Sequence, residues 1–144
     1  MKFKLTLLCL VLSMSAIAQK KVLDHTDYDL WNTVKNKTIS NNGSFIMYSI
    51  ERGEKDNFLK IKSPQGTSIF QYDRAEKGSF TPNSAYATFT IKPWKDSITE
   101  LKRAKVKKDK LPKDTLGIYS LKQNKLTKIA NVKSYKTPEK WEGY

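Results

Sequence analysis

The sequence predicts a protein of the all-β class, and three observations lead to this prediction. Short runs rich in β-branched and aromatic residues are separated by turns that contain Asn, Pro and Gly. One such run returns after 41 residues with its turn. The chain has 144 residues, a length that fits at most one compact domain.

The N-terminus has the pattern of a secretory signal peptide. A basic start, Met1-Lys2-Phe3-Lys4, precedes an uncharged apolar run that ends in Ala16-Ile17-Ala18. The alternative is a membrane anchor, but the run is shorter than the roughly 20 residues that span a bilayer. We therefore expect no stable membrane anchor, cleavage after Ala18, and export to the periplasm or the medium. Cys9 leaves with the peptide, so the mature chain has no cysteine.

Residues 19–38 form an N-terminal segment in which a short helix is predicted. Asp24 or Thr26 could cap one or two helical turns that run from Asp27 to Trp31. From Ile39 onward the composition becomes typical of strands. The predicted strands are 45–50, 58–62, 67–72, 85–91, 116–121 and 125–129.

The repeat aligns residues 39–50 with residues 80–91 without a gap. Apolar residues match apolar residues, hydroxyls match hydroxyls, and each copy opens on a Ser or Thr followed by an Asn-containing turn. A third copy begins at Tyr135, with Thr137-Pro138 as its turn and Trp141 in the place of Phe45 and Tyr86.

A period near 40 with about four strands per unit is typical of a β-propeller blade. The predicted fold is thus an incomplete β-propeller of about two antiparallel blades and the start of a third. The blades are assigned to 39–79 and 80–134, with the third starting in 135–144. An ordinary sandwich with similar strands is the alternative. Closed propellers use about 4–8 blades, so this length cannot close a ring.

Residues 92–113 form a basic insertion in the second blade. They contain nine basic and three acidic residues, a large share of the formal net charge of +13. The insertion could bind phosphate or a membrane surface, or it could be a solvated loop with a helical stretch around 97–108. Trp94 is its only aromatic residue, and we expect no nucleic-acid partner.

The sequence contains no recognisable active site, cofactor site or metal site. With one His and one Cys, no Cys/His metal cage can form. His25 could act as a general base or a metal ligand, but the sequence contains no second His. A local structural role beside Asp24 and Asp27 is therefore favoured. The carboxylate pairs Asp27/Asp29 and Glu51/Glu54 have no distinguishing feature. Ser68 follows Gly66 but has Phe70 two residues later, so the Gly-x-Ser-x-Gly elbow is absent.

The order of these motifs resembles the N-terminal region of exported bacterial serine peptidases of the prolyl oligopeptidase family. The resemblance is carried by residues 21–31, 39–43, 80–83, 89–93, the Lys-rich insertion and 111–118. In that family an N-terminal β-propeller filters peptide substrates, and a C-terminal α/β-hydrolase domain holds the Ser-Asp-His triad. The resemblance implies a truncated gene product, a broken reading frame or one part of a larger enzyme. The chain is then inactive alone, and the missing blades and the hydrolase domain are expected in cis.

A second hypothesis is a small secreted β protein that binds an anionic polymer or the cell envelope through residues 92–113. It is motivated by the net charge alone.

Overall fold

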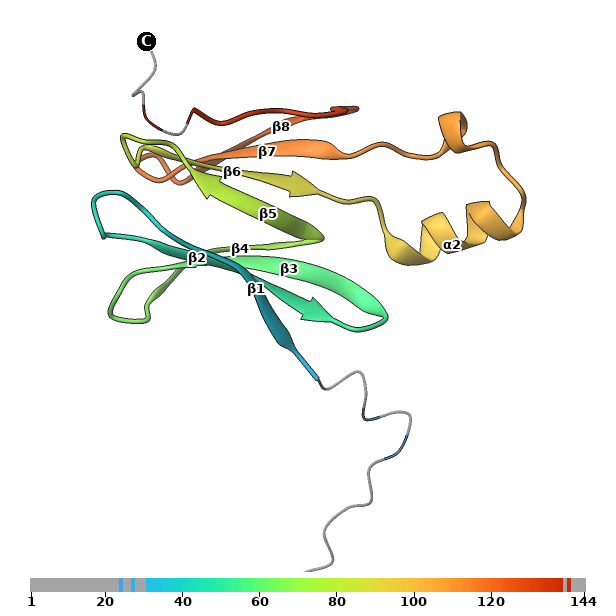
Figure 1. The fold of residues 1–144 in the computed structure, drawn as a ribbon, viewed down its shortest axis with the longest axis horizontal. Helices are drawn as coiled ribbons and strands as arrows, with labels where there is room; N and C mark the ends of the chain where they lie inside the picture. The colour runs from blue at the N-terminus through green and yellow to red at the C-terminus, as the bar shows by residue number, and fades with distance from the viewer. Residues whose placement is uncertain (1–23, 25–26, 28–30, 139, 141–144) are drawn as a thin grey trace, which may run out of the picture.

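The computed structural model describes residues 24, 27, 31–138 and 140, which form two four-stranded antiparallel sheets (Figure 1). The predicted all-β class is confirmed. The first sheet has the order β1-β2-β3-β4, and the second has the order β5-β6-β7-β8. Each sheet is therefore a simple meander of strands that follow one another in the chain.

The strand bounds are as follows. The first sheet consists of β1 Thr33–Ile39, β2 Ile46–Arg52, β3 Lys55–Lys62 and β4 Ser68–Asp73. The second consists of β5 Ala75–Phe80, β6 Tyr86–Ile91, β7 Thr115–Ser120 and β8 Lys125–Ile129. Only Arg74 separates the two sheets in the chain.

The two sheets repeat the same register. Val34 pairs with Ile50 in the first sheet, and Ala75 pairs with Ile91 in the second, each 41 positions later. Both first strands also carry a bulge at the same place, where Asn36 and Lys77 have φ values of 49° and 53°. The repeat therefore extends to the backbone of strands whose sequences, TVKNKTI and AEKGSF, do not match.

The turns that follow β1 and β5 are built alike. Asn42 Oδ1 accepts hydrogen bonds from the Ser40 hydroxyl and from the Ser44 backbone N–H. In the second turn, Asn83 Oδ1 accepts the same two bonds from Thr81 and Ala85. These are Asx-type turns, in which the side chain stabilises its own backbone.

The two turns also lie side by side. Asn41 Nδ2 donates to the Pro82 carbonyl at 2.9 Å, and the Asn42 N–H donates to Ser84 Oγ at 3.2 Å. Equivalent ends of the two sheets therefore meet at the same side of the molecule.

The core lies between the two sheets, and β5 contacts β1, β2 and β3 across this interface. The fully buried side chains Met47, Leu59 and Ile61 come from the first sheet, and Phe89 comes from the second. Phe70 and Tyr119 stack with ring centroids 4.0 Å apart. Gly78 allows β5 to approach closely, because a Cβ there would lie 2.6 Å from Met47 Sδ.

The structure adds two strands to the predicted ones. β1 falls in the segment predicted to contain a helix, and β5 falls at the end of the predicted first blade. The division between the sheets lies at Arg74, whereas the blade boundary was predicted between residues 79 and 80. Residues 28–30 of the predicted helix, the signal peptide and Trp141 lie outside the described residues.

The insertion between β6 and β7 contains α2 Lys95–Arg103 and the 3-10 helix η3 Lys108–Lys110. Ile46 pairs with Lys62 in the first sheet, and the equivalent pair in the second sheet is Ala87 with Tyr119. Ala87 lies 41 positions after Ile46, but Tyr119 lies 57 positions after Lys62. The insertion therefore adds 16 residues to the second repeat. In Figure 1 it projects beyond one end of the sheets. The predicted helical stretch around 97–108 overlaps α2 but begins later than the helix does.

Candidate functional site

The junction between the sheets is organised by Arg74. Its φ of 63° turns the chain from β4 into β5. Its Nη1 donates to the Lys92 carbonyl at 3.0 Å, and its guanidinium lies 4.2 Å from the centroid of the Trp94 ring. Arg74 thus connects both sheets to the base of the insertion.

Lys92 is the centre of a charged cluster at the end of β6. Its ammonium donates to Asp114 Oδ2 at 2.7 Å and lies 3.5 Å from Glu76 Oε1. Burial by itself lowers the pKa of Lys92, but the hydrogen bond and charge of Asp114, together with the charge of Glu76, outweigh it and raise the pKa above its ordinary value. The cluster connects the two stems of the insertion, because Lys92 is the first residue of the insertion and Asp114 is the residue directly after it.

The insertion is also attached to the first sheet. The backbone N–H of Lys95, the first of α2, donates to Asp56 Oδ1 at 3.2 Å. The Lys95 ammonium donates to the Gly53 and Lys55 carbonyls of the β2–β3 turn. Trp94 precedes α2 and supplies no capping side chain, so the Asp56 carboxylate of the first sheet accepts a hydrogen bond from a free backbone N–H at the N-terminus of the helix.

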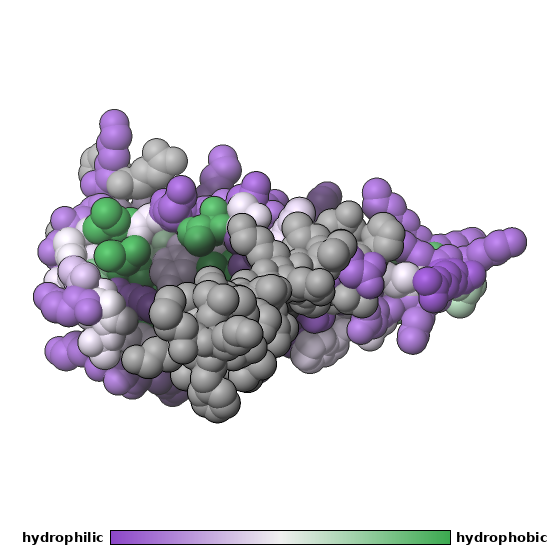
Figure 2. Space-filling model, turned by 90° about the horizontal axis from the view of Figure 1, so that it is seen from below, coloured by the Kyte–Doolittle hydropathy of each residue, from purple (hydrophilic) through white to green (hydrophobic). Residues whose placement is uncertain are grey.

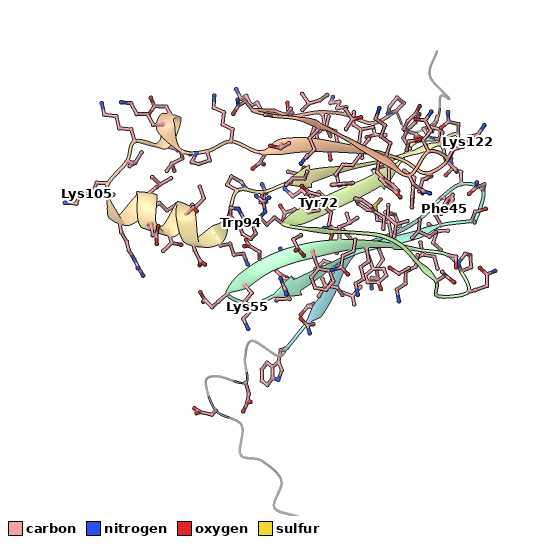
Figure 3. The ribbon with its side chains drawn as sticks, turned by 180° about the vertical axis from the view of Figure 1, so that it is seen from behind. Phe45, Lys55, Tyr72, Trp94, Lys105 and Lys122 are labelled. Atoms are coloured by element: carbon pink, nitrogen blue, oxygen red, sulfur yellow. The ribbon has the colours of Figure 1, made fainter. Side chains whose placement is uncertain are left out.

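The far part of the insertion, residues 102–110, forms a basic tip. Its cations are all exposed and are Lys102, Arg103, Lys105, Lys107, Lys108 and Lys110. Figure 3 shows Lys105 at the distal end and Trp94 at the base, with Phe45 and Lys122 at the opposite end of the sheets. Within the described part of the chain, these six cations have no ion pair.

The first sheet has an outer face that turns away from the second. Apolar side chains lie on this outer face: Val34, Ile39, Ile46, Tyr48, Ile50 and Phe58. Val34 is 45% exposed and Ile39 is 67% exposed. Hydrophobic residues are visible on the molecule from this side, in contrast to the hydrophilic insertion (Figure 2).

The corresponding positions of the second sheet are covered. Ala87 and Phe89, which are 41 positions after Ile46 and Tyr48, are fully buried against the first sheet. The opposite face of the second sheet contacts the chain beyond β8. There the Thr137 hydroxyl lies 2.9 Å from that of Thr88, and the Tyr135 hydroxyl bonds to Lys77 and Thr90.

The residues considered from sequence do not come together in one site. Asp27 Oδ2 accepts a bond from the Asp24 N–H, whereas His25 and Asp29 lie outside the described residues. Glu51 pairs across the strands with Lys35 at 3.8 Å, and Glu54 lies in the turn beside α2. Ser68 is exposed at the start of β4.

Sequence reasoning missed the roles of Arg74, Lys92 and Asp56. All three are charged residues at the ends of strands, a position too common to be informative.

Across the described residues, no group of three or more His, Cys, Asp and Glu side chains could hold a metal ion. The same part of the chain contains no helix with the length and apolar character needed to cross a membrane.

No family model matches the chain, and no curated protein matches its sequence. Its structure is similar to that of the acylaminoacyl peptidase of Pyrococcus horikoshii, with a TM-score of 0.56 and 11% sequence identity. The match covers 85% of this chain and 17% of that peptidase. At this identity the likeness shows a shared fold, in which the two sheets correspond to a small part of a much longer protein.

Proposed function

We propose that this chain is the N-terminal β-propeller region of an exported serine peptidase of the prolyl oligopeptidase family. In this proposal its two sheets are successive blades that help to control the access of peptides to a separate α/β-hydrolase domain. The chain itself supplies no catalytic residue. The further blades and the hydrolase domain belong to the same polypeptide.

The observation that carries the proposal is the way in which one sheet follows the other. The second sheet repeats the register, bulge and turn of the first. The face of the second sheet that contacts the first sheet is the one whose equivalent in the first sheet points outward. Residues 132–138 then lie on the free face of the second sheet, as β5 lies on the first. Units that bury their surface only against neighbours of the same kind are typical of propellers and other repeat folds.

Two further findings support the choice of family. Acylaminoacyl peptidases belong to the prolyl oligopeptidase family, so the fold likeness agrees with the resemblance carried by the sequence motifs. The uncovered apolar side chains Val34 and Ile39 suit a sheet that has another neighbour in the full protein. The predicted signal peptide, residues 1–18, is the basis for proposing export.

The gene provides the most direct test. Sequencing beyond the codon for Tyr144 is expected to reveal further units of about 40 residues, followed by a Gly-x-Ser-x-Gly elbow. A stop codon with no such units downstream in any frame would overturn the proposal.

An activity assay tests the second part of the proposal. The purified chain is expected to leave chromogenic peptide substrates uncleaved, while the full-length product hydrolyses them. Hydrolysis by the chain alone would contradict the assignment of catalysis to a separate domain.

A further inference from the structure

We infer that a cleft at the base of the insertion binds the carboxylates of an acidic peptide segment. The cleft has a volume of about 380 Å³ and lies where the edges of both sheets meet the two stems of the insertion. We call it the cationic cleft. The choice of a peptide as the ligand rests in part on the proposed function, whereas the choice of an anion rests on the cleft itself.

Cationic side chains predominate in the lining of the cationic cleft. Four cationic residues line it, namely Arg74, Lys92, Lys113 and Lys128, and no Asp or Glu is among its lining residues. Asp114 and Glu76 both pair with Lys92, so Arg74, Lys113 and Lys128 supply the positive charge that is left for a ligand. Asp73 lines a neighbouring hollow. This concentration of positive charge favours an anionic ligand.

Its walls are aromatic as well as cationic. Arg74 lies against the Trp94 ring at 4.2 Å, and the Lys128 ammonium lies 5.8 Å from the centroid of the Tyr72 ring and donates to the Tyr72 hydroxyl at 3.4 Å. Figure 3 shows Tyr72 and Trp94 near the junction of the sheets and the insertion. These contacts hold two of the cations in place, so less side-chain entropy is lost when an anion binds.

The shape of the cleft favours a peptide over a long polyanion. The four cations line a single hollow of about 380 Å³, a size that suits a short segment of chain. Pro93, Pro112 and the exposed ring of Trp94 complete the wall. Clusters of cationic side chains are one of the recurring ways in which proteins recognise acidic peptide motifs. The exposed Lys113 and Lys128 ammonium groups are free to meet carboxylates, because no Asp or Glu of the described chain pairs with them.

The test is an NMR titration of the purified chain that follows the indole N–H of Trp94, assigned with Trp94→Phe. The probes are an acetylated tetraglutamate peptide, a tetraglutamine peptide and a short thymidine oligonucleotide. Tetraglutamate is expected to shift the Trp94 signal while tetraglutamine does not. Binding is expected to weaken as salt rises from about 50 mM to about 0.5 M, because exposed charges are screened.

Variants separate the cleft from the general positive charge. Lys113→Ala with Lys128→Ala is expected to weaken tetraglutamate binding about tenfold, because two exposed ion pairs are lost together. The matched control, Lys105→Ala with Lys125→Ala, removes the same charge from the basic tip and from the other end of β8. It is expected to change the affinity by less than about twofold.

Three results would overturn the inference. The first is that tetraglutamate and tetraglutamine bind equally well. The second is that the control variant loses as much affinity for tetraglutamate as the variant of Lys113 and Lys128. The third is that the oligonucleotide binds more tightly than tetraglutamate and depends on Lys113 and Lys128 in the same way. Circular dichroism of each variant shows whether it is folded. None of these results bears on whether the gene encodes further blades, so the two proposals fail separately.

Discussion

The two sheets have nearly the same backbone but different surroundings. Tyr48 and Phe89 occupy the same place in the repeat, yet Phe89 is fully buried between the sheets and Tyr48 lies on the outer face of the first sheet. On the neighbouring strand, Tyr48 pairs with Lys60, whereas Phe89 pairs with Gly117. The Lys60 ammonium lies over the Phe58 ring at 5.2 Å, whereas Gly117 leaves room for the Phe89 ring.

This difference shows how a repeated backbone acquires two kinds of surface. The register, the bulge and the Asx-type turn are set by local hydrogen bonds, so they recur in both copies. The side chains on the equivalent faces are set by what each face contacts. The outer face of the first sheet therefore suits a partner that tolerates lysines, and not a second copy of the interface around Phe89.

The largest expected effect comes from truncating the two equivalent aromatic residues. Phe89→Ala is expected to lower the free energy of unfolding by about 3–5 kcal/mol, because it leaves a cavity between the sheets. Tyr48→Ala is expected to cost about 1 kcal/mol or less, because its ring is only half-buried. Urea denaturation followed by circular dichroism measures both. Equal losses would contradict the assignment of the outer face as uncovered.

The sequence predicted six of the eight strands, since each of these is a short run that contains β-branched or aromatic residues and is bounded by turn residues. It missed β1 and β5 for physical reasons. β5, with Glu76, Lys77 and Gly78, has weak β-propensity, and it forms a strand because it pairs with β6 and packs on the first sheet. β1 is polar and largely exposed, so it carries no burial pattern to detect.

The candidate binding surfaces were less accessible to prediction than the fold. The basic insertion and its position after Ile91 were evident from charge and spacing. The cationic cleft was not, because Tyr72, Trp94 and Lys128 come from three separate segments and meet only through the packing of two sheets. Such long-range neighbours leave no signal in a single sequence.

Substitutions in the two Asx-type turns should lower the free energy of unfolding by a smaller amount, which we expect to be the same in both sheets. Asn42→Ala and Asn83→Ala each remove an acceptor of one hydroxyl and one backbone N–H, and each is expected to cost about 1 kcal/mol. Thermal and urea unfolding of the two variants give the comparison. A difference of more than about 1 kcal/mol would show that the turns do not have equivalent roles.

The smallest expected effect concerns only the second sheet, where Lys92 bonds to Asp114. Folding raises the pKa of Lys92, so the stabilisation is fully present below the unfolded pKa of about 10.4 and is lost as the pH rises through the folded value. Burial also raises the pKa of the Tyr119 hydroxyl, which acts in the same direction.

Above about pH 10 the free energy of unfolding should therefore fall with pH, and Lys92→Met should make that fall shallower. The change is expected to be below about 1 kcal/mol, because the Lys92 side chain is 39% exposed and solvent screens its ion pairs. Urea denaturation at several pH values measures the slope. Lys125→Met is the control, because Lys125 lies in the same sheet and forms no ion pair within the described residues. If Lys92→Met keeps the slope of the unmodified chain, the Lys92–Asp114 contact contributes nothing to stability, and the stems of the insertion must be held by Arg74 and Asp56 instead.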